Sequence, residues 1–162
     1  MGYSFPAALG AAIHETKRQV ICFTGDGSIQ MNIQDLQTMS FMKLPIKLFI
    51  LNNFGYGIIK QFQDTWFDSR YEATGNGYSQ PDFGKIADAY ELKYRKITKI
   101  EDINKNDLDS NDGIIFDVIL HPNTLIEPKI DSGNPLHNMF PYMNLDDDAF
   151  ELEFLRNLNE KK

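Results

Sequence analysis

The stretch GDGSIQMNIQDLQTMSFMKLPIKLFILNN, residues 25–53, decides the fold. It directly follows one short apolar run, VICFT at residues 20–24, and a second run, KLFIL at residues 47–51, lies near its end before Asn52 and Asn53. Short runs of this kind, rich in β-branched and aromatic residues and bounded by turn residues, are typical of buried strands. We therefore expect a strand at each border of the stretch.

The segment between the two strands has helical periodicity. Ile33, Leu36 and Met39 fall on one side at roughly helical spacing. Asn32 is the expected N-cap, and Pro45 is expected to stop the helix. The unit thus reads strand–helix–strand, with parallel strands and a right-handed crossover.

Polar residues follow both strands, at the edge where such units bind their ligands. Asp26 and Asn53 would stand about 5 Å apart on neighbouring strands, and their oxygens suit Mg²⁺ or Ca²⁺. Gly25 and Gly27 let the backbone approach a ligand, and the helix that follows favours a phosphate. A metal ion that bridges a diphosphate to the protein fits this pattern.

The spacing of GDG and NN, separated by one helix, resembles the thiamin diphosphate-binding motif. The competing interpretation is an α/β core with two ordinary turns and no nucleotide-like ligand. The upstream segment MGYSFPAALGAA resembles the region before GDG in acetolactate synthases, where a large apolar side chain props the cofactor into a bent conformation. The resemblance places Met1 at the position of that side chain. The alternative is that Met1 is simply a start methionine and stands there by coincidence. Family members are several hundred residues long, so the resemblance implies that this chain is a carboxy-terminal fragment whose domain is truncated at its start.

The resemblance also implies roles for the residues after NN. The carbonyl of Gly55 would be the third protein ligand of the metal, with Asp26 and Asn53. A helix beginning near Ile58 corresponds to the G-M-V-x-Q-W helix of acetolactate synthases, with Phe62 in place of the tryptophan. Ile59 and Phe62 would line the substrate channel, or else simply pack the helix down. The implied cofactor-binding set is Met1, Gly25, Asp26, Gly27, Ser28, Asn53, Gly55, Tyr56, Gly57 and Ile58, and no catalytic residue is expected in this chain.

The rest of the chain continues the alternation of helices and strands. Residues 64–81 read as an aromatic-rich loop that acts as a lid or interface, or as an unremarkable surface loop. Asp82 is the expected N-cap of a helix, in a segment that resembles the family's PDF motif. A polar helix is expected at residues 100–108 and a central strand at residues 114–120.

We expect a domain at residues 1–120 and a carboxy-terminal tail, residues 121–162, that packs on the domain or on a partner subunit. The tail contains PLHNMFP, which resembles an acetolactate synthase-like subset associated with bacterial polysaccharide and deoxysugar synthesis. Three consecutive aspartates, residues 146–148, lack the spacing of a calcium loop and fit a helix N-terminus better.

The composition restricts the binding partners and the cellular compartment that the chain suits. The formal charge of −7 over 162 residues disfavours a nucleic acid or an anionic membrane as partner. Cys22 is the single cysteine, so no internal disulfide forms, which suits the cytoplasm. No apolar run reaches the length of a membrane-spanning helix.

Together these features predict a three-layer α/β fold with a mostly parallel sheet, the thiamin diphosphate-binding fold. The resemblance implies an acetolactate synthase-like carboligase that acts on pyruvate or a related 2-oxo acid and uses thiamin diphosphate and Mg²⁺. It allows FAD on a domain outside this chain, and it implies that the intact enzyme is a homodimer or homotetramer. The fragment is expected to be inactive alone, because the glutamate that activates the cofactor comes from another domain in such enzymes. The alternatives are a 2-oxo acid decarboxylase or oxalyl-thioester lyase, and a non-catalytic remnant.

Overall fold

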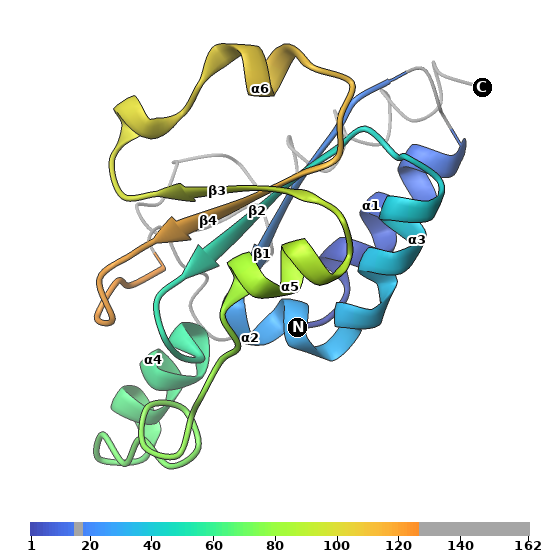
Figure 1. Ribbon diagram of the computed structural model, residues 1–162. Helices are drawn as coiled ribbons and strands as arrows, with labels where there is room; N and C mark the ends of the chain where they lie inside the picture. Colours follow the sequence, from blue (N-terminus) through green and yellow to red (C-terminus); the bar gives the residue numbers. More distant parts are fainter. Residues whose placement is uncertain (15–17, 127–162) are drawn as a thin grey trace, which may run out of the picture. The chain divides into compact units, whose positions relative to one another are not determined.

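A parallel sheet forms the centre of the computed structural model, which describes residues 1–14 and 18–126 (Figure 1). Its strands are β1 (Val20–Gly25), β2 (Ile46–Asn52), β3 (Lys93–Ile97) and β4 (Ile114–Ile119). They lie in the order β1-β2-β4-β3, and all three neighbouring pairs are parallel. The predicted α/β class and parallel sheet are confirmed, and the two predicted strands β1 and β2 pair as expected.

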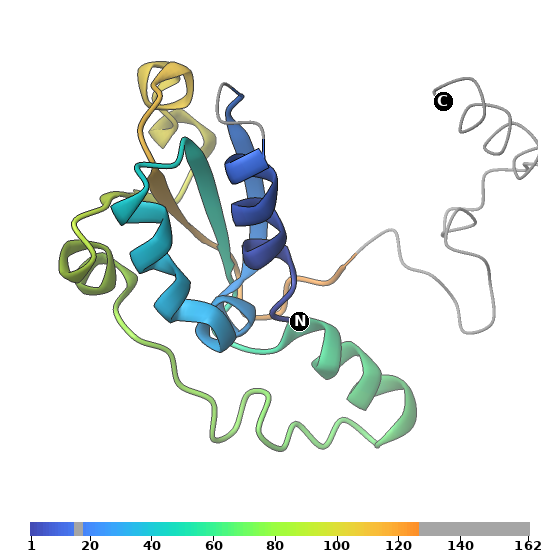
Figure 2. The same cartoon turned by 90° about the vertical axis from the view of Figure 1, so that its right-hand side faces the viewer.

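Helical segments cover the sheet. The helices of the described residues are α1 (Ser4–His14), α2 (Asp26–Ile29), α3 (Leu36–Phe41), α4 (Gly57–Trp66), α5 (Phe83–Ala89) and α6 (Lys105–Asp109), with 3₁₀ turns at Gln30–Asp35 and Ile100–Asp102. Helices α1, α3 and α5 lie along one face of the sheet (Figures 1 and 2). Leu108 of α6 packs against the buried cluster on the other face, which includes Phe49 and Phe116. None of these helices is long and apolar enough to cross a membrane.

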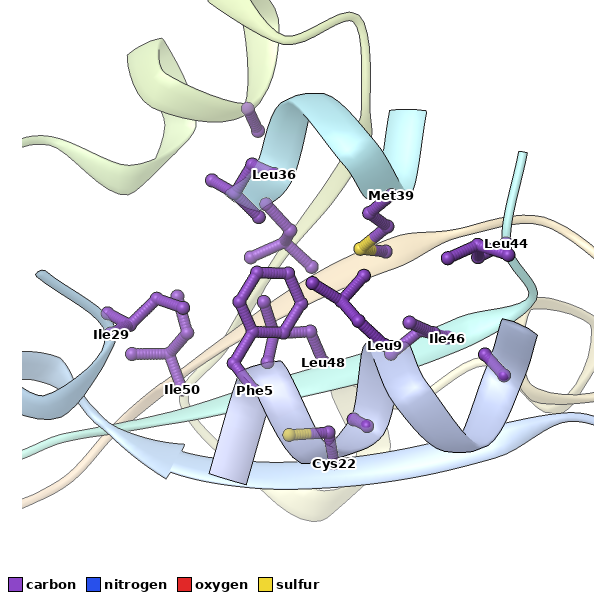
Figure 3. Close-up of a cluster of buried hydrophobic side chains, with 14 of the residues drawn as sticks. Phe5, Leu9, Cys22, Ile29, Leu36, Met39, Leu44, Ile46, Leu48 and Ile50 are labelled. Atoms are coloured by element: carbon purple, nitrogen blue, oxygen red, sulfur yellow. The ribbon is translucent and has the colours of Figure 1, made fainter. Parts of the chain in front are cut away.

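The main core lies between the sheet and these three helices. Phe5 and Leu9 of α1 meet Leu36 and Met39 of α3 above the β2 side chain Leu48 (Figure 3). All five are buried, and truncating such a side chain to alanine typically costs about 2–5 kcal/mol. The helical periodicity of Leu36 and Met39 therefore correctly identified core residues.

The other face of the sheet carries a row of three phenylalanines. Phe23, Phe49 and Phe116 occupy paired positions on β1, β2 and β4, and their rings stack at centroid distances of 5.1 and 4.6 Å. Phe116 is buried, whereas Phe23 remains 59% exposed. Of the residues that the structure describes, this face is thus buried at Phe116 on β4 and exposed at Phe23 on β1.

The helix between β1 and β2 begins earlier than the sequence predicts. Helix α2 starts at Asp26, directly after the strand, and Asn32 lies inside a 3₁₀ turn with φ −135°. Asn32 is not the N-cap of α3, because Asp35 occupies that position and Asn32 Oδ1 accepts no hydrogen bond from the described residues. The prediction was wrong because the chain already turns helical at the GDG glycines. Helix α3 then ends at Phe41, four residues before Pro45. Lys43, which lies between the helix end and Pro45, has a positive φ of 51°.

The predictions for residues 82–108 have mixed outcomes. Asp82 caps α5 by accepting hydrogen bonds from the amides of Gly84 and Lys85. The polar helix predicted at residues 100–108 is divided into a 3₁₀ turn and α6, because Ile103 and Asn104 have extended backbone angles. Strand β3 was not predicted at all.

Met1–Leu125 forms one compact unit of the chain. The expectations for PLHNMFP and for the three aspartates lie outside the described residues, so the proposed tail boundary stays a prediction.

Candidate functional site

The site begins where β1 and β2 end. Gly25 pairs with Leu51, so Asp26 and Asn53 follow neighbouring strands at the same edge of the sheet. The loop after β2 then turns back at Phe54, which has a positive φ of 58°. This turn brings Gly55 to Asp26: the Gly55 amide donates to Asp26 Oδ2 at 3.1 Å.

Asp26 is a buried carboxylate with 1% of its surface exposed. Burial raises the pKa of Asp26, and hydrogen bonds with Tyr78 and with the amides of Gly27 and Gly55 partly oppose this shift. The two ion pairs found in the described residues, Lys93–Asp112 and Arg95–Asp107, lie elsewhere. A carboxylate buried without a positive partner is unfavourable unless it is protonated or binds a cation.

Three glycines make close contacts around this carboxylate. A Cβ on Gly27 would stand 2.3 Å from the Tyr56 ring, and one on Gly57 would stand 2.5 Å from Asn53 Nδ2. A Cβ on Gly55 would stand 2.5 Å from the Thr74 carbonyl. The GDG turn and the loop after β2 are therefore packed directly on each other.

The two adjacent asparagines have different surroundings. Asn52 is buried and donates to Asp117 Oδ1 at 2.9 Å, and Tyr94 donates to the other oxygen of Asp117 at 2.9 Å. Asn52 thus ties β2 to β4 and β3 through side chains. Asn53 is partly buried beside Gly57, and its role as a ligand of the metal stays a prediction.

A family model described as "Thiamine pyrophosphate enzyme, C-terminal TPP binding domain" matches residues 1–109. The chain belongs to this family. It is 41% identical over 103 residues to the acetolactate synthase large subunit of Cyanidium caldarium, covering 64% of this chain and 18% of that protein. It is 46% identical over 90 residues to the acetolactate synthase large subunit of Haemophilus influenzae, covering 56% and 16%.

A solved structure gives the same fold. The thiamine diphosphate-dependent 4-hydroxybenzoylformate decarboxylase of Rhodococcus jostii RHA1 superimposes with a TM-score of 0.66 at 28% identity, covering 75% of this chain and 23% of that chain. The chain therefore spans less than a quarter of the length of these three proteins.

The donors present in this thiamin diphosphate-binding domain fit a hard cation. One buried carboxylate, one amide side chain and a glycine-rich backbone offer oxygen ligands, and no three His, Cys, Asp or Glu side chains gather within the described residues. Such a mixed oxygen set suits Mg²⁺, which retains water and binds substrate phosphates. Asp26, buried and without a cationic partner in the part of the chain that the structure describes, fits the metal.

The start of the chain lies beside the GDG turn. The Gly2 amide donates to Ser28 Oγ at 2.8 Å, although the two residues are 26 positions apart. Met1 is 65% exposed. The structure therefore brings Met1 and Ser28 to the same edge as Asp26, and the bracing role of Met1 stays a prediction.

Helix α4 presents its apolar side chains to solvent. None of its residues is buried, and Ile58 and Phe62 are exposed. Ile59, Phe62 and Gln63 line an open hollow of about 450 Å³ together with Phe67, Arg70 and Glu72 of the following loop. Ile59 is partly buried and Phe62 is exposed, so the choice between a channel lining and simple packing stays open for Ile59, and packing on this domain accounts less well for Phe62.

Tyr78 is a site residue that the sequence did not reveal. It lies in the loop between α4 and α5, yet its hydroxyl accepts a hydrogen bond from Gln30 Nε2 at 3.1 Å, which places it next to the 3₁₀ turn that follows α2. Burial and the Asp26 charge raise the pKa of Tyr78, so the phenol stays protonated. No motif marks this residue, because only the path of the loop brings it to α2.

Proposed function

We propose that this chain is the diphosphate- and Mg²⁺-binding domain of a thiamin diphosphate-dependent carboligase of the acetolactate synthase type. The longer protein would act on pyruvate or a related 2-oxo acid. The observation that carries the proposal is Asp26: a carboxylate that is buried, has no cationic partner among residues 1–14 and 18–126, and is enclosed by the GDG turn and the loop after β2.

Each residue of the site has a defined task in this proposal. Asp26, Asn53 and the Gly55 carbonyl hold the metal, and amides of the GDG turn and α2 bind the diphosphate. Ile59 and Phe62 bound the space for the substrate and exclude water. Thiamin diphosphate, when bound, supplies the chemistry that removes CO₂ from a 2-oxo acid.

The remaining expectations complete the proposal. The protein would work in the cytoplasm as a homodimer or homotetramer, with FAD, if used, on another domain. The exposed residues of α1, such as Ala11 and Ile13, and the aromatic residues Trp66 and Phe67 supply apolar surface for a subunit interface.

Calorimetry of the purified chain tests the site. Titration with thiamin diphosphate in the presence of Mg²⁺ should give a saturable heat that is lost without Mg²⁺ or in Asp26→Ala. The control is Asp88→Ala, which removes an exposed carboxylate on α5 and should bind as the unmodified chain does. Absence of binding in the folded, unmodified chain would contradict the proposal and favour a non-catalytic module.

A decarboxylase is the second candidate, because the superimposed Rhodococcus protein is one. Product analysis of the longer protein with pyruvate separates the two. Acetolactate supports the carboligase, whereas CO₂ and an aldehyde without acetolactate support the decarboxylase.

A further inference from the structure

Thr74 is a buried residue in a loop that is otherwise largely exposed. The loop joins α4 to α5, and its residues 67–70 are exposed, whereas only 4% of the Thr74 surface is. The Thr74 hydroxyl donates to Gln63 Oε1 of α4 at 2.6 Å, and Gln63 Nε2 donates to the Glu72 carbonyl at 3.3 Å. The Gln63 side chain therefore fastens Thr74 to α4.

The Thr74 carbonyl lies directly against Gly55. It accepts a hydrogen bond from the Tyr56 amide at 3.2 Å, and a Cβ on Gly55 would stand 2.5 Å from it. The Gly55 amide donates to Asp26 Oδ2 at 3.1 Å. The two N–H groups on either side of the Gly55 carbonyl are thus both bound, one to Asp26 and one to Thr74.

The geometry of the peptide bond makes the contact with Thr74 act on the Gly55 carbonyl. A trans peptide unit is planar, so the Tyr56 N–H and the Gly55 C=O point in opposite directions. A hydrogen bond that fixes this N–H therefore also fixes the direction of the carbonyl. A backbone oxygen has no side-chain rotamer of its own, so contacts of this kind are what can orient it as a ligand.

We propose that Thr74 is a positioning residue for the Gly55 carbonyl. Its own carbonyl holds the Gly55–Tyr56 peptide in the orientation that presents the Gly55 oxygen to the metal, and its hydroxyl keeps it in place through Gln63. The part that concerns the metal rests on the proposed function above. Groups that orient a metal ligand typically change metal affinity 10–100-fold when they are removed.

The variant that tests this role is Thr74→Val, which keeps the shape of the side chain and removes the hydroxyl. Gln63→Leu removes the same hydrogen bond from its other end, and Thr74→Ser keeps the hydroxyl as the conservative variant. The matched control is Thr65→Val, which removes an exposed hydroxyl that donates to a backbone carbonyl within α4.

The Gly55–Tyr56 peptide can be observed selectively by NMR. Glycine labelled with ¹³C at its carbonyl, combined with ¹⁵N-labelled tyrosine, gives correlations only for Gly–Tyr pairs. The sequence has three such pairs, Gly2–Tyr3, Gly55–Tyr56 and Gly77–Tyr78. Loss of one signal in Tyr3→Phe and of another in Tyr78→Phe assigns the third to Gly55–Tyr56.

Hydrogen exchange of the Tyr56 amide measures how firmly Thr74 holds this peptide. In the metal-free chain, Thr74→Val and Gln63→Leu should each accelerate this exchange about tenfold, whereas Thr74→Ser and Thr65→Val should leave it unchanged. The Thr74→Val, Gln63→Leu double variant should exchange no faster than either single variant, because both substitutions remove the same hydrogen bond.

Two outcomes of the exchange measurement would overturn the positioning role. One is unchanged Tyr56 exchange in Thr74→Val. The other is a double variant in which the two effects multiply, because the effect of Thr74 would then not pass through Gln63. The measurement needs no ligand, so it decides how the peptide is held even if the cofactor does not bind.

The Gly55 carbonyl signal reports separately on the metal. Titration with Mg²⁺ in the presence of thiamin diphosphate should shift this signal in the unmodified chain, and Thr74→Val should need 10–100-fold more Mg²⁺ for the same shift. Thr74→Ser and Thr65→Val should titrate as the unmodified chain does. Equal titration of Thr74→Val and the unmodified chain would refute the role toward the metal, whereas failure of the unmodified chain to bind would refute the proposed function.

Discussion

At the scale of a single residue, Asp26 combines two properties that conflict in the absence of a ligand. Its position at the end of β1 buries it, and burial disfavours the ionised form that a metal needs. Hydrogen bonds from Gly55 and Tyr78 offset part of this cost. A bound cation would offset the rest, so metal binding and folding should be linked at this residue.

The first prediction at this scale concerns Asp26→Asn in the metal-free chain. Because the folded pKa of Asp26 is raised, this carboxyl favours folding when protonated and loses that contribution as pH rises through its folded pKa. The asparagine variant should therefore have a higher melting temperature than the unmodified chain at pH 7, and the difference should shrink toward about pH 4. Melting curves across this range, with Asp88→Asn as control, check the prediction; a variant that is less stable at pH 7 would contradict it.

At the scale of elements, the GDG turn and the segment before α4 behave as one packed unit. Gly27 has no room for a methyl group because the Tyr56 ring lies in its place. Gly10, in the middle of α1, has nothing within 4 Å of the same position. The two glycines thus differ in their surroundings while sharing a helical backbone.

Alanine substitutions should separate these two cases. Gly27→Ala should lower the free energy of unfolding by about 1–3 kcal/mol, since the Tyr56 ring must move. Gly10→Ala should raise it by about 0.5–1 kcal/mol, because alanine favours the helix. Chemical denaturation measures both changes. Equal effects of the two substitutions would show that the contact between Gly27 and Tyr56 does not affect the free energy of unfolding.

The elements also show where sequence-based prediction succeeded and failed. Apolar periodicity identified β1, β2 and the buried side of α3, because burial alone sets those patterns. Strand β3 was missed because Lys93, Arg95 and Lys96 interrupt any apolar run, and it pairs with β4 alone at the end of the strand order. Its pairing depends on register with a strand distant in sequence, which no local pattern encodes.

The candidate site was predictable to a similar degree. Motif spacing indicated Asp26, Gly27 and Asn53, and the structure places Asp26 and Gly55 in contact. The place of Tyr78 could not be predicted, because only the path of the loop brings it to Gln30 and Tyr56, which are distant in sequence. The structural role of Asn52 was likewise hidden, since its partner Asp117 lies on a strand far along the chain.

At the scale of the whole molecule, the proposed function assigns one end of a cofactor site to this chain. The described residues offer groups for a metal and a diphosphate, but their three glutamates, Glu72, Glu91 and Glu101, are exposed. The resemblance to thiamin enzymes implies a glutamate that activates the cofactor's aminopyrimidine ring. The relatives, of which the chain spans less than a quarter, have ample length to provide it.

We therefore predict that the purified chain does not turn over pyruvate, even with thiamin diphosphate and Mg²⁺. Assays for CO₂ and acetolactate should give background rates, at least about 10³-fold below those of the longer protein, because positioned proton transfer alone contributes 10²–10⁴-fold. Sustained turnover that disappears in Asp26→Ala would contradict this prediction. Glu72→Gln, at the hollow beside α4, would then show whether that carboxylate serves as the activating group.

The row of phenylalanines across the sheet has a consequence for handling the protein. Phe23 and its neighbour Ile21 are exposed on β1, which pairs with β2 alone among the described strands. At neutral pH the net charge of −7 keeps such surfaces apart by repulsion, but this repulsion vanishes near the pI of about 4.9. Two β1 edges could then pair backbone to backbone with their apolar faces stacked, which is how exposed strands start aggregates. Solubility should therefore be lowest in mildly acidic buffer, and purification well above pH 5 at modest salt preserves the electrostatic protection.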